Sequence, residues 1–434
     1  MFERRPRTAY EETLLQKVSD YLPTGVRNPT TSPRHTMVVK SARGSRIRDC
    51  SGNEYIDYLL GSGPMLLGHA HPAVVAAVRE QLERGSSYLM VNEPAVLLAE
   101  EIVRATPCAE KVSLHCSGSE ATFFAMRLAR AFRKRDKVLK FEGAYHGMHD
   151  YALMGTHWML HPADFPTAIP DSAGIPRCIQ SEVLIAPFND MRTTADIIAK
   201  HRDELAAVIV EPMQRTIPPK PGFLQALREI TKEYGIVLIF DEVVTGFRFA
   251  YGSAQEYYGV VPDLCALGKS MSGGHPITAV CGRADLMAQA DPDPARYVRG
   301  EHVRLTGTFS SNPVSAVASL ATLAELRRAG AYERLFATGK RLMNALKSLL
   351  ADANIPAQIL GEPPAFEVWF SDREIVDFRS SMHADAKRRE RFVQLLVDRG
   401  IIKAHEKFFI SLAHTDEDVD TTIAAFRSAI AELR

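Results

Sequence analysis

Residues 236–244 read IVLIFDEVV, and residues 262–274, which follow closely, read PDLCALGKSMSGG. The first stretch is a short, continuously apolar run that ends in Asp241 and Glu242. Such a run is typical of a strand that is buried on both faces of a parallel sheet. In open α/β sheets, ligands bind outside the carboxyl ends of the strands. The stretch therefore predicts an α/β domain in which Asp241 faces a ligand.

Strand-like runs and helical patterns alternate on both sides of this stretch. Between residues 119 and 135, apolar side chains recur at the spacing of one helix face. The expected strands are 111–116, 138–141, 183–186, 206–210, 236–240 and 276–281. Strands that alternate with helices indicate a layered α/β fold. We therefore expect a large α/β domain over residues 65–313, with a mostly parallel central sheet.

The two ends of the chain have a different pattern. Residues 1–64 begin with a helical stretch and continue with a small antiparallel meander over 38–59, which is too small to stand alone. Residues 314–434 are mainly helical. The expected helices are 314–328, 332–352, 385–399 and 416–433, and the expected strands are 365–370 and 407–412. The sequence therefore predicts a smaller α+β domain that is built from both termini.

The composition excludes several classes of protein. The chain has 52 Lys and Arg against 52 Asp and Glu, so no net charge attracts it to nucleic acid or to an anionic membrane. No segment approaches the length of about 20 apolar residues that spans a bilayer. The start of the chain resembles neither a secretory signal nor a transit peptide. Six scattered cysteines without a CxxC pair indicate reduced thiols, so we expect a cytoplasmic protein.

Lys269 lies in the sequence Gly268-Lys269-Ser270, which superficially resembles a nucleotide-binding loop. A P-loop requires another glycine five positions before Gly268, and that position is Asp263. The nucleotide-dependent enzyme, the rival class for this chain, is therefore disfavoured. Flanking glycines instead let the backbone bring the Lys269 amine close to a planar ligand, although a lone lysine is more often only a surface charge.

Cys116-Ser117-Gly118-Ser119 joins an expected strand to the helix that follows. Free amides and the helix dipole at a helix N-terminus favour a phosphate, although a serine at this position is usually only a cap. Combined with Asp241 and Lys269, this motif supplies partners for a phosphate, a ring nitrogen and an aldehyde. These three groups are those of pyridoxal phosphate.

The chemistry of that cofactor assigns a task to each residue. A buried carboxylate such as Asp241 keeps the pyridine nitrogen protonated by charge pairing. Lys269 would hold the cofactor as a Schiff base and then move a proton between the substrate carbon and the cofactor. The aromatic ring of Tyr145 suits stacking on the pyridine face, and a core aromatic after a strand is the equally ordinary interpretation.

Five motifs in order give the chain a family resemblance. The stretches CSGSEATFFAMRLARAF, VIVEPMQ, LIFDEVVTGFR, PDLCALGKSMSGG and TGTFSSNP resemble those of the class III pyridoxal-phosphate-dependent aminotransferases. Within that class, the chain is most similar to the glutamate-1-semialdehyde 2,1-aminomutase branch and its aminotransferase relatives. The likeness covers about nine tenths of the chain. It implies a fold-type I transferase that forms a homodimer with active sites at the subunit interface, and whose cofactor alternates between pyridoxal and pyridoxamine phosphate.

The resemblance also implies roles for individual residues. Ser117, Gly118 and Ser119 would bind the phosphate with help from Thr308 of the partner subunit. Tyr145 and Val243 would cover the two faces of the cofactor ring, and Glu211 would lie near its substrate side, with His146 as a secondary candidate. The same resemblance argues against a metal site at His69 and His71, because GHAHP opens a helix in this family.

Departures from the aminomutases concern the substrate. Ser62 stands where those proteins have a tryptophan, and their carboxylate-binding arginine has Arg27 and Arg34 as uncertain replacements. The approach to Glu406 is shorter. We therefore expect transfer of an amino group from an amino acid, a β-amino acid or an amine to a keto or aldehyde acceptor. The alternatives are an intramolecular 2,1-aminomutase, a racemase on the same scaffold and a catalytically inactive binding descendant.

Overall fold

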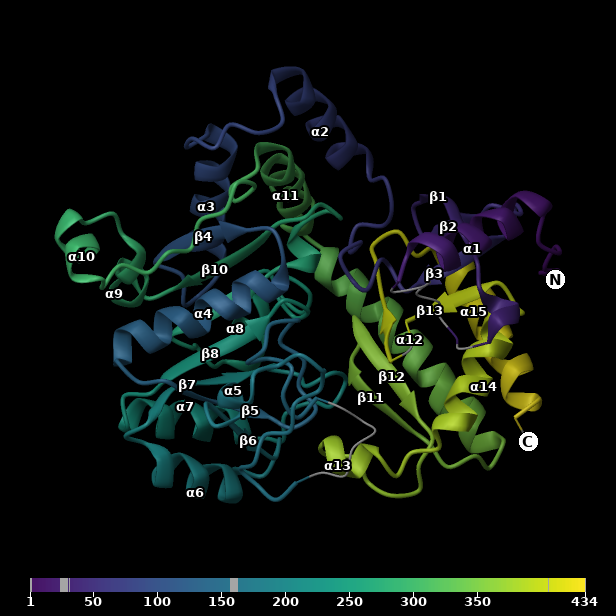
Figure 1. Cartoon of the computed structure of the whole chain (residues 1–434). Coiled ribbons are helices and arrows are strands. Elements are labelled where there is room, and N and C mark those ends of the chain that lie inside the picture. The colour runs from purple at the N-terminus through teal and green to yellow at the C-terminus, as the bar shows by residue number, and fades with distance from the viewer. Residues whose placement is uncertain (1, 24–29, 31, 157–162, 405, 434) are drawn as a thin grey trace. The chain divides into compact units, whose positions relative to one another are not determined.

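The computed structural model of the chain describes residues 2–23, 30, 32–156, 163–404 and 406–433. These residues form two compact units (Figure 1). The larger unit comprises 73–327 and 376–382, and the smaller unit comprises 1–72, 328–375 and 383–434. Residues from both ends of the chain therefore meet in the smaller unit. The boundaries differ from 64 and 313, the limits that we expected, because the 313–326 helix packs within the larger unit.

The larger unit is built around a seven-stranded sheet with the order β4-β10-β9-β8-β7-β5-β6. Its strands are β4 (Lys111–His115), β5 (Lys137–Phe141), β6 (Val183–Ala186), β7 (Leu205–Val210), β8 (Val237–Glu242), β9 (Leu264–Leu267) and β10 (Thr278–Gly282). β10 runs in the opposite direction to the other six strands. The expectation of an α/β fold with a mostly parallel sheet is confirmed. β9 lies within the PDLCALGK motif and was not among the predicted strands.

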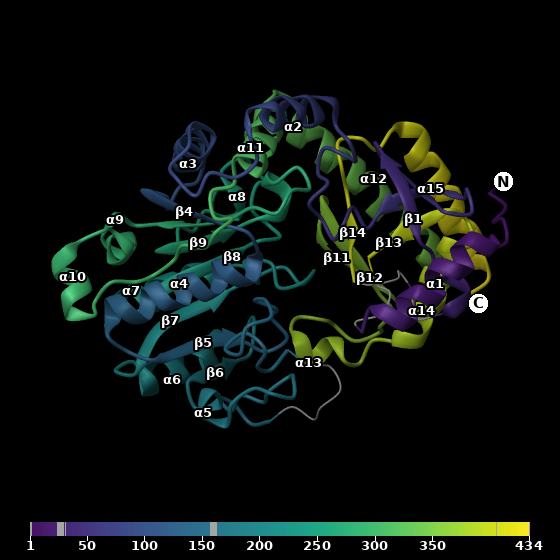
Figure 2. The ribbon, with the colours of Figure 1, turned by 45° about the horizontal axis from the view of Figure 1, so that its top comes forward.

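Helices cover both faces of this sheet. Their bounds are α2 (Pro72–Arg84), α3 (Glu93–Ala105), α4 (Gly118–Arg133), α5 (Arg177–Gln180), α6 (Met191–His201), α7 (Phe223–Glu233), α8 (Ser253–Tyr258), α9 (Ala284–Met287), α10 (Pro294–Arg299), α11 (Pro313–Leu326) and α13 (Phe378–Ser381). In Figures 1 and 2, α4 crosses one face over the central strands. Ala125 and Leu128 of α4 belong to one core cluster with Ile239 of β8. On the other face, Phe141 of β5 packs edge-on against Phe223 of α7, as alternation along a strand requires.

In the described part of the chain, the smaller unit contains two sheets and four α-helices. Its elements are α1 (Ala9–Tyr21), β1 (Val39–Arg43), β2 (Arg46–Asp49), β3 (Glu54–Tyr58), α12 (Ala331–Asp352), β11 (Gln358–Glu362), β12 (Ala365–Trp369), α14 (Ala386–Val397), β13 (Ile401–Lys403), β14 (Phe408–Phe409) and α15 (Asp416–Ala431). The predicted meander β1–β3 gains a parallel fourth strand, because β13 pairs with β3. Among the described residues, no helix is both long and apolar enough to cross a bilayer.

Gly339 marks the tightest approach in the smaller unit. A Cβ atom built on this residue of α12 would lie 1.9 Å from the carbonyl oxygen of Pro363. We expect Gly339→Ala to lower the free energy of unfolding by about 2–3 kcal/mol, because the backbone of a packed core must shift to admit the methyl group. Thermal denaturation measures this loss. Gly307→Ala is the control, because its Cβ would meet nothing closer than 3.6 Å. Equal melting temperatures for the two variants would contradict the packing described here.

Candidate active site

Most of the predicted cofactor residues follow strands of the large sheet at one edge. β5, β7, β8 and β9 run parallel, and β4 points the same way because both β4 and β9 are antiparallel to β10. The carboxyl ends of these five strands and the segments after them therefore lie at the same edge of the sheet. They carry Ser117, Tyr145, Glu211, Asp241 and Lys269. The topology thus gathers residues that are up to 152 positions apart, since 269 − 117 = 152.

Ser117 is the N-cap of α4 and forms a capping box with Glu120. The Ser117 hydroxyl accepts the Glu120 amide at 3.3 Å, and the Glu120 carboxylate accepts the amides of Cys116 and Ser117, both at 2.9 Å. The first-turn amides of Gly118 and Ser119 are donors that a helix cannot pair internally. The arrangement fits a phosphate at the start of α4, as the sequence predicts.

Gly118 also lets the start of α4 come close to the segment after β8. A Cβ atom on Gly118 would lie 3.0 Å from Cγ1 of Val243. Ser119 secures the neighbouring loop, because its hydroxyl accepts the Met148 amide at 2.9 Å. Val243 thus lies directly beside the proposed phosphate cradle, where a side chain at position 118 would collide with it.

Asp241 is a buried carboxylate at the end of β8. Its Oδ2 lies 2.7 Å from Nδ1 of His146, and its Oδ1 accepts the Val243 amide at 3.1 Å. His146 is itself buried, and the Thr122 hydroxyl of α4 donates to its carbonyl oxygen. Sequence reasoning had given His146 only a secondary place. The geometry makes it the direct partner of Asp241, a contact across 95 positions that spacing alone does not reveal.

Lys269 begins a short 3-10 helix, Lys269–Met271, directly after β9. Its backbone has φ +39°, an uncommon conformation for a residue with a side chain. Burial lowers the pKa of the Lys269 amine below its ordinary value, and the carboxylates of Asp241 and Glu211 partly oppose that shift. The amine is therefore neutral, and so nucleophilic, at a lower pH than that of an exposed lysine. A neighbouring contact anchors the loop, because the buried Arg248 donates to the Ser270 hydroxyl at 2.8 Å.

Tyr145 and Glu211 meet at the next corner of the edge. The Tyr145 amide donates to Oε1 of Glu211 at 2.8 Å, and Oε2 of Glu211 accepts the Arg215 amide at 3.2 Å. The guanidinium carbon of Arg215 lies 5.5 Å from the centre of the Tyr145 ring. Tyr145 remains 39% exposed, so part of its ring is available to a ligand. The motif VIVEPMQ predicted only Glu211 as a site residue. Arg215 was not predicted, although it follows Glu211 by four residues.

The remaining candidates belong to other segments of the chain or lie outside what the structure describes. Thr308 is exposed, and the hydrogen bonds of the described residues do not join it to Ser117, Gly118 or Ser119. Arg27 lies outside the described residues. In the smaller unit, Arg34 is exposed and lies 3.5 Å from the Asp398 carboxylate. Ser62 occupies a turn with φ +69°, and Glu406 is partly buried in a turn of that unit.

His69 has an ordinary structural partner. Its Nε2 lies 2.7 Å from Oδ2 of Asp57. Over the part of the chain that the structure describes, no cluster of three His, Cys, Asp or Glu side chains is arranged to hold a metal ion. His69 is therefore explained by its contact with Asp57.

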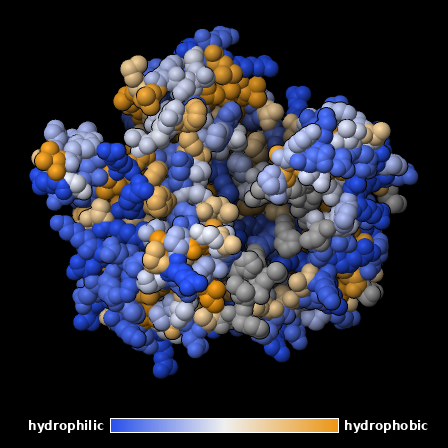
Figure 3. Space-filling model, viewed as in Figure 1, coloured by the Kyte–Doolittle hydropathy of each residue, from blue (hydrophilic) through white to orange (hydrophobic). Residues whose placement is uncertain are grey.

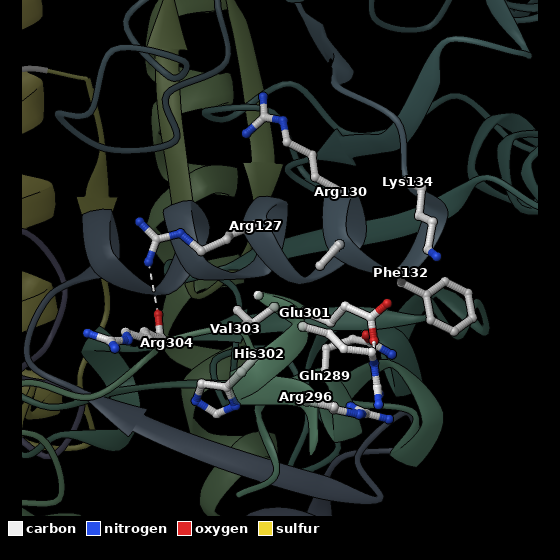
Figure 4. Close-up of a pocket in the computed structure, with 13 residues that line it drawn as sticks. Arg127, Arg130, Phe132, Lys134, Gln289, Arg296, Glu301, His302, Val303 and Arg304 are labelled. Carbon is white, nitrogen blue, oxygen red and sulfur yellow. Dashed lines mark hydrogen bonds and ion pairs between the residues drawn. The ribbon is translucent and has the colours of Figure 1, made fainter. Parts of the chain in front are cut away.

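A separate cavity of about 780 Å³ lies beside the C-terminal half of α4 (Figure 4). Six basic side chains and one acidic side chain contribute to its lining, namely Arg127, Arg130, Lys134, Arg296, Arg299, Arg304 and Glu301. The guanidinium of Arg127 donates to the Arg304 carbonyl at 2.9 Å. None of the predicted cofactor residues lines this cavity, because those on α4 lie at its N-terminus. The basic cavity is therefore distinct from the candidate active site.

Known proteins are similar to this chain in sequence and in fold. The family model described as aminotransferase class-III matches residues 28–430. A glutamate-1-semialdehyde 2,1-aminomutase of Methanocaldococcus jannaschii is 41% identical over 421 residues, which are 95% of this chain and 96% of that protein. An omega-transaminase from Sphaerobacter thermophilus superimposes with a TM-score of 0.91 at 34% identity, over 99% of each chain. A transaminase with bound pyridoxal phosphate superimposes with a TM-score of 0.89 at 27% identity, also over 99% of each chain.

Pyridoxal phosphate suits the donor set of this edge. The amides at the start of α4 would bind its phosphate, the buried carboxylate of Asp241 would pair with its ring nitrogen, and the amine of Lys269 would bond its aldehyde. A cofactor with these three groups therefore finds a partner of the right chemistry for each.

The contact between His146 and Asp241 has a measurable consequence. We expect His146→Phe to weaken the binding of pyridoxal phosphate by about 10- to 100-fold, because a hydrogen bond to a buried charged group contributes about 1.5–3 kcal/mol. Titration of the visible absorption band of the bound cofactor measures this affinity. His149→Phe is the matched control, since His149 lies in the same loop and contacts Thr122 rather than Asp241. The same affinity in both variants would remove His146 from the site.

Proposed function

Because the chain belongs to the class III aminotransferase family, we propose that it uses pyridoxal phosphate to move an amino group on a small amino or oxo acid. The sequence analysis preferred transfer between two molecules. The name of the curated relative at 41% identity instead favours the alternative, an intramolecular 2,1-aminomutase of the glutamate-1-semialdehyde kind. The observation that carries the proposed chemistry is the placement of Lys269 and Asp241 at the ends of the neighbouring strands β9 and β8.

Lys269 is the residue that bonds the cofactor and moves protons. The bound cofactor supplies a conjugated ring that accepts electron density from the substrate carbon. Nζ of Lys269 attaches the cofactor covalently and, once released by the substrate, carries a proton to or from that carbon. Burial lowers the pKa of this amine, so the neutral form that accepts the proton is available at lower pH.

Asp241, supported by His146, orients the cofactor and holds a proton on its ring nitrogen. Nδ1 of His146 lies 2.7 Å from one carboxylate oxygen and the Val243 amide donates to the other, so the carboxylate is held in a fixed orientation. Val243 would cover one face of the ring and Tyr145 the other, while Ser117, Gly118 and Ser119 would bind the phosphate. Glu211 positions Tyr145 through the amide at 2.8 Å.

A second copy of the chain completes the proposed site. Exposed apolar side chains gather where α2 is joined to α3, and this part of the surface can be followed in Figure 3. They include Leu89, Met90 and Val91, which are 80%, 76% and 87% exposed. Asn92 donates to the Ser311 carbonyl at 2.9 Å, which ties this apolar segment to the segment that carries Thr308 and the exposed Phe309. Apolar surface of this kind is typical of protein–protein contacts. A homodimer buries it and presents Thr308 to the partner's phosphate.

Transfer between two molecules is the second candidate function. It is favoured by the omega-transaminase at 34% identity, whose chain and this one each superimpose over 99% of their length. Position 62 is a serine in this chain, whereas the resemblance implies a tryptophan at this position in the aminomutases. This difference supports the same candidate. Both functions require the same cofactor residues and differ in whether the oxo product leaves.

Replacement of Lys269 tests the shared chemistry. We expect Lys269→Ala to abolish the cofactor that borohydride fixes covalently to the protein, because Lys269 is the lysine of the segment 262–274 that contains the end of β9. Mass spectrometry after reduction measures this adduct. Lys220→Ala, which removes an exposed lysine of the same unit, should label like the wild type. Undiminished labelling of Lys269→Ala would overturn the assignment.

The products separate the two candidate functions. An enzyme loaded with pyridoxamine phosphate and given glutamate 1-semialdehyde should form the isomer 5-amino-4-oxopentanoate without any added amino acceptor. A transaminase should instead require a donor and a 2-oxo acid and consume them in equal amounts. Chromatography of both reaction mixtures distinguishes these results. Failure of both reactions, with these substrates and with a panel of amine donors, would contradict the proposed function.

A further inference from the structure

Arg215 is a cation of the candidate site to which the function above gives no task. It lies between β7 and α7, four residues after Glu211. Its amide donates to Oε2 of Glu211, and its Nε donates to the Gly143 carbonyl at 3.1 Å. Its guanidinium lies over the ring of Tyr145. Three contacts therefore bind Arg215 to the residues that surround the proposed substrate side of the ring.

The backbone of Arg215 adopts a conformation that its side chain disfavours. Residues 214 and 217 exchange both backbone hydrogen bonds, at 3.1 and 2.8 Å, so Arg215 is the first central residue of a tight turn. Its φ is +59°, a value that such turns usually assign to glycine or asparagine. Strained residues of this kind cluster at ligand sites, where the surrounding structure maintains them. The strain at position 215 is compatible with a role of its side chain at a ligand site.

The charge of Arg215 acts on the reacting amine. Two arginines lower the pKa of Lys269 through their charge, Arg248 and Arg215. Arg248 is fully buried and donates to the Val244 carbonyl and the Ser270 hydroxyl, so its contacts are those of a structural residue. Arg215 is only partly buried and lies beside the exposed ring of Tyr145. Of these two cations, Arg215 is the one with access to a ligand.

We propose that Arg215 determines substrate specificity by binding a carboxylate of the substrate beside Tyr145. The inference rests on the proposed function and deepens it, because it names the residue that recognises the carboxylate of the substrate. A guanidinium has five N–H groups in a planar fork, so it binds a carboxylate through two hydrogen bonds while Nε stays on Gly143. The ring of Tyr145 keeps that plane in place.

Matched amine donors test this role directly. In each pair, one donor carries a carboxylate and the other carries a methyl group at the same position. The pairs are 4,5-diaminopentanoate with 1,2-diaminopentane, and 3-aminobutanoate with butan-2-amine. The loss of the visible band of the lysine-bound cofactor measures the first half of the reaction, which both candidate functions share. The variants are Arg215→Met and Arg215→Lys, and Lys220→Met removes an exposed charge from the same connecting segment as the control.

We expect Arg215→Met to lower kcat/KM for the carboxylate donors by about 10- to 100-fold, the range for a hydrogen-bonded pair of charged groups. The methyl donors should lose much less, because they lack the carboxylate and only the effect of the Arg215 charge on Lys269 remains. Arg215→Lys should recover part of the loss, because lysine keeps the charge without the fork. Lys220→Met should match the wild type with every donor.

Other outcomes overturn the inference in distinguishable ways. An equal loss for both members of a pair would show that Arg215 only supports Tyr145. Unchanged rates in both Arg215 variants would show that the carboxylate binds elsewhere. Wild-type protein that keeps the lysine-bound cofactor but reacts with no donor would overturn the proposed function, and the role of Arg215 with it.

Discussion

A carboxylate removed from water has to be charge-paired or hydrogen-bonded, and Asp241 shows how this chain meets that requirement. Oδ2 lies 2.7 Å from His146 and Oδ1 accepts the Val243 amide. These contacts join the end of β8 to the loop after β5, and Thr122 of α4 holds the same loop through the carbonyl of His146. The arrangement around the cofactor therefore depends on one buried acid. Losing a partner of such a group costs more than the net contribution of an average hydrogen bond.

The close approach of α4 to the sheet follows from the same geometry. Small residues on the inner face of α4, such as Ala121 and Ala125, allow the helix to pack directly on the central strands. Gly118 then admits Val243 at the helix N-terminus. A phosphate at this N-terminus and a ring nitrogen at Asp241 would be the two ends of one ligand, so the packing distance between helix and sheet would determine which ligand fits. Core packing and cofactor recognition are in this sense one constraint.

Arg215 links the proposed cofactor site to the choice of substrate. Glu211 uses its two carboxylate oxygens for the amides of Tyr145 and Arg215, and so fixes an aromatic ring and a cation relative to each other. The acid thereby serves as a positioning residue for both. Glycine would adopt the backbone conformation of this turn without strain, whereas arginine is strained in it. A function of the Arg215 side chain therefore explains the residue better than folding does.

The sequence was sufficient for the fold class and for most of the proposed cofactor residues. The apolar run before Asp241, the glycines beside Lys269 and the serines at the start of α4 are weak signals one by one, and their combination with the family resemblance makes these residues candidates. The helices of the terminal unit were predicted to within a few residues. β9 was missed because four apolar residues between a proline and a glycine resemble a loop.

Only the tertiary structure decided which residues meet. The partnership of His146 with Asp241 joins two strand ends that are far apart in the chain, and the position of Arg215 over Tyr145 depends on the turn after β7. The parallel pairing of β13 with β3, which unites the two ends of the chain, belongs to the same class. Periodicity and motif spacing describe what a segment prefers by itself. Contacts across many residues arise from strand order and packing, which no single segment encodes.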